Sequence, residues 1–335
     1  MTTYKEIFGK PVKHLSTDPT DAEATGQVWY NSTSGTFKSI VAGAAWSSTT
    51  PLTTATVAGA TLGTQTAALI TSGYGSPGNP SGIPQTQIYT GSGWTAGGAL
   101  ANPRVYFSGA GTTTAGLVFG GISQTPPYRT AETEEYNGTA WSEQSDLSTA
   151  RSQLVGTGTQ TAGMCITGSS IPNAYTTLVE DYDGSSWTAG TATSIGKHLA
   201  MGCGTSTASV VFGGNINPAV IVATTEDWDG SSWTAGGVMN TARRAGGGVG
   251  IQTGALCFGG AGLPSPSPSY TAVTESYDGS TWTTSSATLA TAMADQDGMG
   301  TNTAALLAGG NPGPAQGAAT QEYIFGVATE TITTS

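Results

Sequence analysis

"EDWDGSSWTAGG" (Glu226–Gly237) nearly repeats "EDYDGSSWTAGT" (Glu180–Thr191), which lies 46 residues upstream. Two further markers keep register with the tryptophan of this phrase: a Gly-Thr-x-Thr-Ala turn or near variant, and an aromatic residue five positions before the tryptophan. Three independent markers in one register indicate an internal repeat, so the phrase belongs to the scaffold. The tryptophans are Trp46, Trp94, Trp141, Trp187, Trp233 and Trp282, at spacings of 48, 47, 46, 46 and 49, and the turns begin at Gly63, Gly111, Gly158, Gly204, Gly250 and Gly300.

Each repeat predicts four short strands, as the third one illustrates. A first strand at about Gln153–Thr157 leads through the Gly158–Thr161 turn into an apolar second strand that ends in glycine. A third strand covers 177–182, and the Asp-Gly turn at Asp183 reverses the chain into a fourth strand at Trp187. Four strands in each of six repeats predict an all-β, six-bladed propeller with four-stranded blades.

The glycine pairs, the period and the Glu-x-Tyr-Asp-Gly-x-x-Trp run (Glu180–Trp187) resemble kelch repeats over roughly residues 41–335. The resemblance implies a closed propeller in which the repeated tryptophan packs between neighbouring blades. The last repeat lacks its tryptophan, whereas Trp46 precedes the first complete repeat. We therefore expect the Trp46 segment to supply the outer edge of the final blade. A seventh blade built from the N-terminal hairpin is the alternative.

Charged residues follow the repeat in pairs. Four blades carry a base before the first strand and a glutamate two residues before the aromatic marker, whereas the other two blades have Thr56 and Met293 with Gln87 and Gln321. Because a blade has either both the base and the acid or neither, we predict that each such pair forms a partly buried ion pair within its blade, with a structural role. A ring of functional charges around the channel is the alternative. The paired residues are Arg104 with Glu134, Arg151 with Glu180, Lys197 with Glu226, and Arg243 with Glu275.

The composition narrows the classes of partner. The 335 residues carry a net charge of −11 and no basic stripe, which argues against nucleic acid as a partner. No apolar run is long enough to cross a membrane, and the first residues lack the apolar core of a signal peptide. The cysteines, expected to be small buried apolar residues, are Cys165, Cys203 and Cys257.

The residues give little support for catalysis. Kelch-type propellers include copper radical oxidases that need several histidines, but this chain has only His14 and His198, far apart in sequence. We therefore expect no metal, no cofactor and no enzymatic activity, with a structural role for His198. Asp295 and Asp297 have the chemistry to bind a cation or to act on glycosides, but the expectation for such a pair is a solvated loop.

Residues 1–40 do not fit the repeat. The stretch "ATGQVWYNSTSGTFKSIV" (Ala24–Val41) predicts a hairpin with Ser-Gly at its turn and alternating Val28, Tyr30 and Phe37. It resembles the start of virion structural proteins of tailed bacteriophages of marine bacteria, including the cyanophage type. The resemblance implies that residues 1–40 dock on other virion proteins while residues 41–335 face outward. It also implies assembly in the host cytoplasm without a signal peptide, and a homo-oligomer in the particle.

The binding face is expected at the loops between the second and third strands, since these differ between blades while the strands repeat. In a propeller such loops emerge on one face, where aromatic and cationic side chains offer contacts to a host-surface glycan or protein. Loops that merely tolerate variation are the alternative. For the whole protein, the alternative to a virion component is a carbohydrate-active enzyme or lectin. The candidate contact residues are Tyr74, Tyr128, Arg129, Tyr175 and Tyr270.

Overall fold

The computed structural model describes residues 6–7, 10–11, 13–18, 27–75, 82–124, 126–171, 174–218, 220–262, 269–311 and 317–331. The chain divides into two compact units, one comprising Trp46–Tyr323 and the other Met1–Ala45 together with Ile324–Ser335. The boundary predicted after residue 40 differs from this division. Two strands, β5 (Thr36–Ser48) and β34 (Thr320–Thr331), each run from one unit into the other.

Six four-stranded sheets, or blades, make up the larger unit. Blade 1 contains β6 (Ala60–Gly63), β7 (Ala68–Thr71), β8 (Thr86–Tyr89) and β9 (Trp94–Gly97). Blade 2 contains β11 (Ser108–Gly111), β12 (Gly116–Phe119), β14 (Thr133–Tyr136) and β15 (Trp141–Glu143). Blade 3 contains β16 (Val155–Thr159), β17 (Ala162–Ile166), β20 (Val179–Tyr182) and β21 (Trp187–Ala189).

The remaining blades follow the same order from the innermost strand outward. Blade 4 contains β22 (Met201–Thr205), β23 (Ala208–Phe212), β26 (Thr225–Trp228) and β27 (Trp233–Ala235). Blade 5 contains β28 (Gly247–Ile251), β29 (Gly254–Phe258), β30 (Thr271–Tyr277) and β31 (Trp282–Met293). Blade 6 contains β32 (Asp297–Gly300), β33 (Ala304–Ala308), β34 and β5.

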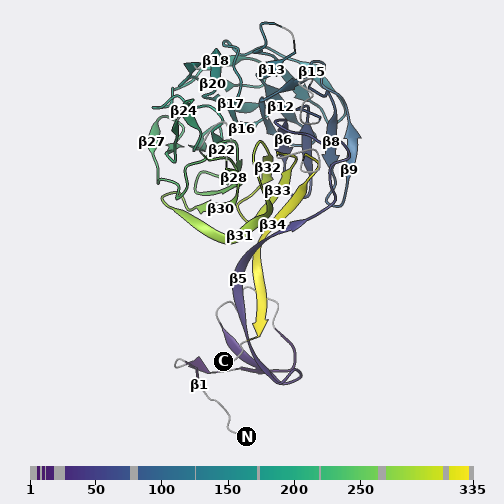
Figure 1. Cartoon of the computed structure of the whole chain (residues 1–335), viewed down its shortest axis with the longest axis vertical. Helices are drawn as coiled ribbons and strands as arrows, with labels where there is room; N and C mark the ends of the chain where they lie inside the picture. The colour runs from purple at the N-terminus through teal and green to yellow at the C-terminus, as the bar shows by residue number, and fades with distance from the viewer. Residues whose placement is uncertain are drawn as a thin grey trace. The chain divides into compact units, whose positions relative to one another are not determined.

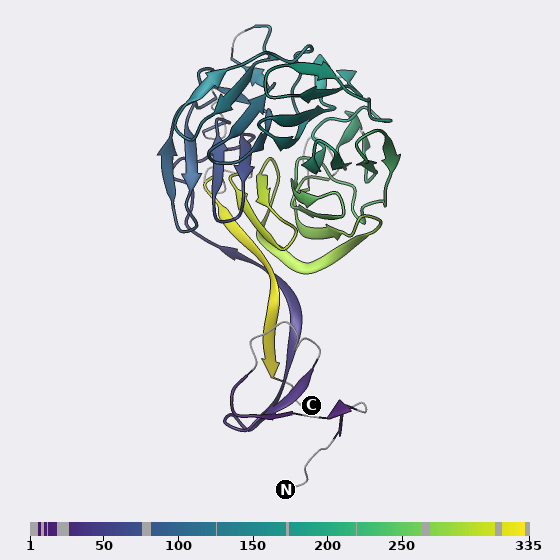
Figure 2. The same cartoon turned by 180° about the vertical axis from the view of Figure 1, so that it is seen from behind.

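The blades lie around a common centre, which confirms the predicted all-β, six-bladed propeller (Figure 1). The outer strand of blade 6 is β5, which reaches Trp46 from the N-terminal side, so the expected closure of the ring is also confirmed. Views from both faces show β5 beside β34 (Figures 1 and 2). The seventh blade considered as an alternative is therefore wrong, because the strands at residues 13–15 and 28–31 belong to the same sheet as β5 and the described strands form six blades.

The repeated tryptophan joins each blade to the one before it. In four blades its indole Nε1 donates a hydrogen bond to a threonine hydroxyl on the third strand of the preceding blade, at 2.9 to 3.0 Å. Trp46 makes this bond to Thr274 and also packs edge-on against Phe258, with ring centroids 4.7 Å apart. An indole that fills an apolar gap and satisfies its one donor contributes to both packing and register.

The second residue after each second strand is a glycine that serves the same junction; it follows another glycine in four blades, Ser72 in blade 1 and Thr167 in blade 3. The N–H of this glycine donates to the carbonyl oxygen of the residue at the base position of the next blade. Gly121 donates to Arg151 at 2.8 Å, and Gly310 closes the ring by donating to Thr56 at 3.1 Å. The φ angles of these glycines are +110° and +101°, a region that side chains disfavour. Glycine is therefore needed at the junction between one blade and the next.

The four base–acid pairs lie within single blades and are almost fully buried. The separations between the charged atoms are 3.1 Å for Arg104–Glu134, 2.9 Å for Arg151–Glu180, 3.3 Å for Lys197–Glu226 and 2.6 Å for Arg243–Glu275. The second carboxylate oxygen of each glutamate accepts a backbone N–H from the linker that enters the blade. Gln87 and Gln321 accept the equivalent bond in the two blades without a base. All six blades thus keep a side-chain oxygen that accepts this backbone N–H, and only the charge of that side chain differs between blades.

The smaller unit contains β1 (Glu6–Ile7), β2 (Lys10–Pro11), β3 (Lys13–Leu15) and β4 (Val28–Asn31) besides the ends of β5 and β34. The predicted hairpin forms, since β4 pairs antiparallel with β5 across the turn at 32–35. Trp29, which is 1% exposed, occupies its buried face, and Tyr30 packs against Phe37 on the other. Asp18 accepts hydrogen bonds from Trp29, Asn31 and Lys38, and these contacts hold its pKa below the usual value, with Lys38 the largest cause.

Candidate functional site

The channel narrows at one end to a ring of backbone hydrogen bonds. In each blade the residue two positions after the base position donates its N–H to the carbonyl oxygen of the equivalent residue in the preceding blade, at 2.7 to 3.1 Å. All six residues have φ between 51° and 57°. We call this set the mouth ring, and it consists of Ala58, Tyr106, Gln153, Leu199, Ala245 and Asp295.

The backbone of the mouth ring repeats while its side chains do not, so chemistry specific to this protein concentrates there. The ring also explains why the third blade's first strand starts at Val155 and not at the predicted Gln153. A left-handed backbone at Gln153 takes that residue out of the strand.

The loops between the second and third strands reach the same end of the channel, because the start of each first strand pairs with the end of the second. Each loop pairs with itself or with the segment that precedes its own blade's first strand, in short antiparallel ladders. These are β10 (Arg104–Val105) with β13 (Ile122–Ser123), β18 (Ser169–Ile171) with β19 (Ala174–Tyr175), and β24 (Asn215–Asn217) with β25 (Val220–Ile221). Isolated bridges such as Val57 with Tyr74 and Ala261 with Tyr270 complete the pattern. Parts of all six loops, namely 76–81, 125, 172–173, 219, 263–268 and 312–316, lie outside the described residues.

This pairing changes the surroundings of the five residues proposed as contacts. Tyr128 is 55% exposed, but Tyr74, Arg129, Tyr175 and Tyr270 are half-buried. Arg129 donates from Nε to the carbonyl oxygen of Ser169 at 2.9 Å, which joins blades 2 and 3. Of the five, Tyr128 is therefore the only exposed side chain, and the other four are half-buried near the mouth.

His198 is held by its neighbours at the mouth. It stacks on Tyr175 with ring centroids 3.9 Å apart, and its Nδ1 lies 2.9 Å from Oε1 of Gln153. Burial, followed by the charges of Arg244 and Arg129, lowers the pKa of His198 to about 4. The imidazole is therefore neutral near pH 7 and links the loop of blade 3 to the mouth ring.

Asp295 and Asp297 are not in a solvated loop, so that expectation is wrong. Asp295 belongs to the mouth ring and Asp297 begins the innermost strand β32, and both line a cavity of about 80 Å³ under the ring. Burial raises the pKa of Asp295 to about 6, against the opposing effects of the Arg244 charge and a hydrogen bond from Asn311. Burial and the Asp295 charge raise the pKa of Asp297 to about 8. Near neutral pH the first carboxyl is mainly ionised and the second mainly protonated.

Three tyrosines and one arginine complete this side of the mouth. Tyr74 and Tyr106 meet edge to face, with ring centroids 5.8 Å apart. Burial is the largest cause that raises the pKa of Tyr74, Tyr106 and Tyr270, and the negative charge of Asp295 adds to it in all three. Arg244 acts on Asp295 with the opposite sign. Blades 5, 6, 1 and 2, which are consecutive around the ring, thus supply one aromatic and charged cluster.

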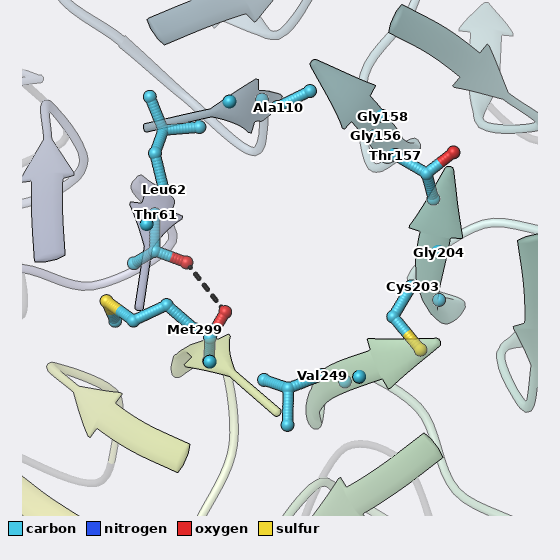
Figure 3. A pocket seen from close by; sticks show the side chains of 18 residues that line it. Thr61, Leu62, Ala110, Gly156, Thr157, Gly158, Cys203, Gly204, Val249 and Met299 are labelled. Carbon is cyan, nitrogen blue, oxygen red and sulfur yellow. Dashed lines mark hydrogen bonds between the residues drawn. The ribbon is translucent and has the colours of Figure 1, made fainter. Parts of the chain in front are cut away.

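The channel beyond the mouth is lined by uncharged residues. The innermost strands of all six blades surround a cavity of about 130 Å³, and the hydroxyl of Thr61 donates to the carbonyl oxygen of Gly298 across two of them (Figure 3). None of the 18 described residues that line it carries a charge. Cys203, on this wall, and the other two cysteines are buried and free.

Within the described ranges, no cluster of three or more His, Cys, Asp or Glu side chains has an arrangement that could hold a metal ion. In the same part of the chain, no helix is both long and apolar enough to cross a bilayer.

Tyr106, Arg244, Asp295 and Asp297 were not among the residues predicted from sequence as contacts. A sequence signal for two of these residues, Tyr106 and Asp295, appears when the six repeats are aligned on the base position. The column two places after the base contains Tyr106, Gln153 and Asp295 beside small or aliphatic residues, a variation that strand packing does not require.

No protein-family model matches the chain, and no curated protein matches it. Among solved structures, the chain is similar to one described as "Structure of YjhT", with a TM-score of 0.70 and 14% sequence identity. The alignment covers 84% of this chain and 99% of that one. At this identity the likeness extends to the propeller fold alone. In total 229 chains of solved structures match, and a fold so widely shared leaves function to be argued from the site.

Proposed function

We propose that this protein is a non-enzymatic structural protein of a tailed bacteriophage, displayed on the particle as part of a tail fibre, the tail or the capsid surface. The N-terminal residues attach it to other virion proteins. The propeller binds a glycan or protein of the host surface through the face that carries the mouth.

The unit that contains the N-terminal residues carries this proposal. Its sequence resembles the start of phage virion proteins, and its hairpin has a buried centre at Trp29 and a polar tie at Asp18. The unit also includes Ile324–Ser335, so residues from both ends of the sequence belong to it. A compact unit of its own is suited to attachment to another protein.

Mass spectrometry of purified particles from the encoding phage tests the proposal. Peptides from this chain are expected in particles that survive a density gradient and a high-salt wash. Their absence from such particles, with the protein present in the infected cell, would reject the virion role.

A carbohydrate-active enzyme or lectin outside a virion is the second candidate. The observation in its favour is the carboxyl pair Asp295 and Asp297, whose pKa values of about 6 and about 8 suit a base and an acid at one site. Incubation of oligosaccharides with the purified chain, followed by NMR, separates the candidates. Turnover that is lost in Asp297→Asn would replace the non-enzymatic proposal.

A further inference from the structure

Arg244 carries a charge but takes no part in the ion pairs within the blades. The adjacent Arg243 forms the buried ion pair with Glu275 at 2.6 Å, as its equivalents do in three other blades. Arg244 is half-buried at the mouth, and among the described residues its guanidinium takes part in no ion pair. It nevertheless lies close enough to Asp295 to affect that carboxyl electrostatically. A cation and an anion thus share the mouth without direct contact.

Asp295 lines the mouth cavity together with Gln296 and Asp297. Asn311 donates a hydrogen bond to the Asp295 carboxylate. A carboxylate has two oxygens and accepts several hydrogen bonds, so a ligand that carries hydroxyl donors suits this cavity.

Tyr106 lines the same cavity and packs edge to face against Tyr74. Tyr74, Tyr106 and Tyr270 are half-buried and interact electrostatically with Asp295, and no hydrogen bond of their hydroxyls is found within the described residues. A phenol offers an apolar face together with a hydroxyl that both donates and accepts.

We propose that the mouth binds the hydroxyl-rich end of a saccharide chain between Arg244 and Asp295, with a sugar ring against the tyrosines. One hydroxyl of the sugar donates to the Asp295 carboxylate while a neighbouring oxygen accepts from the Arg244 guanidinium. The C–H face of the sugar covers an aromatic ring, as in other contacts between apolar and π surfaces. This inference rests on the proposed binding function and names its ligand class and its position.

The other ligand classes fit less well. A phosphate or a nucleic acid would meet the Asp295 carboxylate in a chain with a net charge of −11. An apolar ligand would cover the charges of Asp295 and Arg244 and offer them no hydrogen bond. The cavity of about 80 Å³ has room for only a few water-sized groups, which admits the hydroxyls of a terminal sugar and leaves the rest of the chain above the ring.

Binding of the purified full-length chain to an array of neutral and acidic oligosaccharides tests this inference, with short peptides and inorganic phosphate as parallel probes. Calorimetry with the best oligosaccharide should show a loss of about ten-fold or more for Arg244→Gln and for Asp295→Asn, since each removes one charged hydrogen-bonding group. The controls are Glu143→Gln and Asp146→Asn, which each remove one charge from an exposed residue on or just after the outer strand β15. Both should keep affinity within about two-fold, because neither residue lies at the mouth.

Each outcome has one meaning when all variants keep the wild-type melting temperature. Saccharide binding that survives both Arg244→Gln and Asp295→Asn would place the site elsewhere and overturn the inference. Binding of peptide or phosphate alone, or of no probe, would overturn the ligand class. Detection of the protein in purified particles would remain unaffected by either result, so the virion role fails or stands separately. If Asp295→Asn is less stable than wild type, Arg244→Gln with the Glu143→Gln control carries the test alone.

Discussion

The amide nitrogen of Gly310 lies 3.1 Å from the carbonyl oxygen of Thr56, and this hydrogen bond joins the last blade to the first. A Cβ atom at Gly310 would lie 2.7 Å from Cβ of Gln296 and would occupy a backbone with φ of +101°. We expect Gly310→Ala to lower the free energy of unfolding by about 1 to 3 kcal/mol through this strain. Chemical denaturation measures the change. Gly93→Ala is the control, since nothing lies within 4 Å of its new methyl group, and equal stability of the two variants would contradict the account.

The buried ion pairs should show strong coupling. Removal of one partner, as in Glu180→Gln, leaves the Arg151 charge buried and should cost about 3 to 5 kcal/mol. The double variant Arg151→Met/Glu180→Gln reproduces the pair found in blade 6 and keeps an acceptor for the Ser148 N–H. It should therefore be more stable than either single variant. Additive losses in the double-mutant cycle would show that the charges do not depend on each other.

Stability should fall as pH rises through the titration of Asp297. The folded-state pKa of about 8 lies above the ordinary value of 3.8, so between these pH values the folded protein keeps a proton that the unfolded chain releases. The stabilising contribution is complete below about pH 4 and is lost as pH approaches 8. Asp297→Asn should flatten this slope and raise stability near pH 8, by on the order of 1 kcal/mol. Parallel stability curves for variant and wild type would contradict the assignment.

Ligand affinity should depend on the ionisation of Asp295. Its pKa of about 6 results from burial, which raises it, and from the Arg244 charge and a hydrogen bond from Asn311, which lower it. The Asp295 charge in turn raises the pKa of Asp297, Tyr74, Tyr106 and Tyr270. Because the proposed contact uses the carboxylate, saccharide affinity should decrease as pH falls through about 6. Titration calorimetry between pH 5 and 7 measures the effect. An affinity that is constant over this range in the wild type would argue against a contact through ionised Asp295.

The repeat made most of the fold predictable from sequence. Periodic markers such as the Trp187 turn fix the number of blades, and the solitary Trp46 indicates how the ring closes. The N-terminal hairpin was predicted as well, but its buried side chain is Trp29 and not the alternating Tyr30 set. Alternation identifies two faces of a strand without deciding which one is covered.

The site was less predictable, for a physical reason. Loop variability pointed to the right end of the propeller, but the loops form short antiparallel pairs, which half-bury Tyr74 and Tyr175. The positions that gather the chemistry belong to the linkers before the first strands, where a left-handed backbone at Asp295 brings a carboxyl to the axis. The residue type does not reveal this left-handed conformation, since Tyr106 and Leu199 adopt it too.

The most direct test of the central claim is a cryo-electron microscopy map of the intact particle at a resolution that distinguishes propeller blades. The account predicts six-bladed density on the outer surface, attached through the unit that contains Met1–Ala45, with the face that carries Tyr128 and Arg244 open to solvent. A propeller whose mouth is sealed against another virion protein, or particles with no such density, would contradict it.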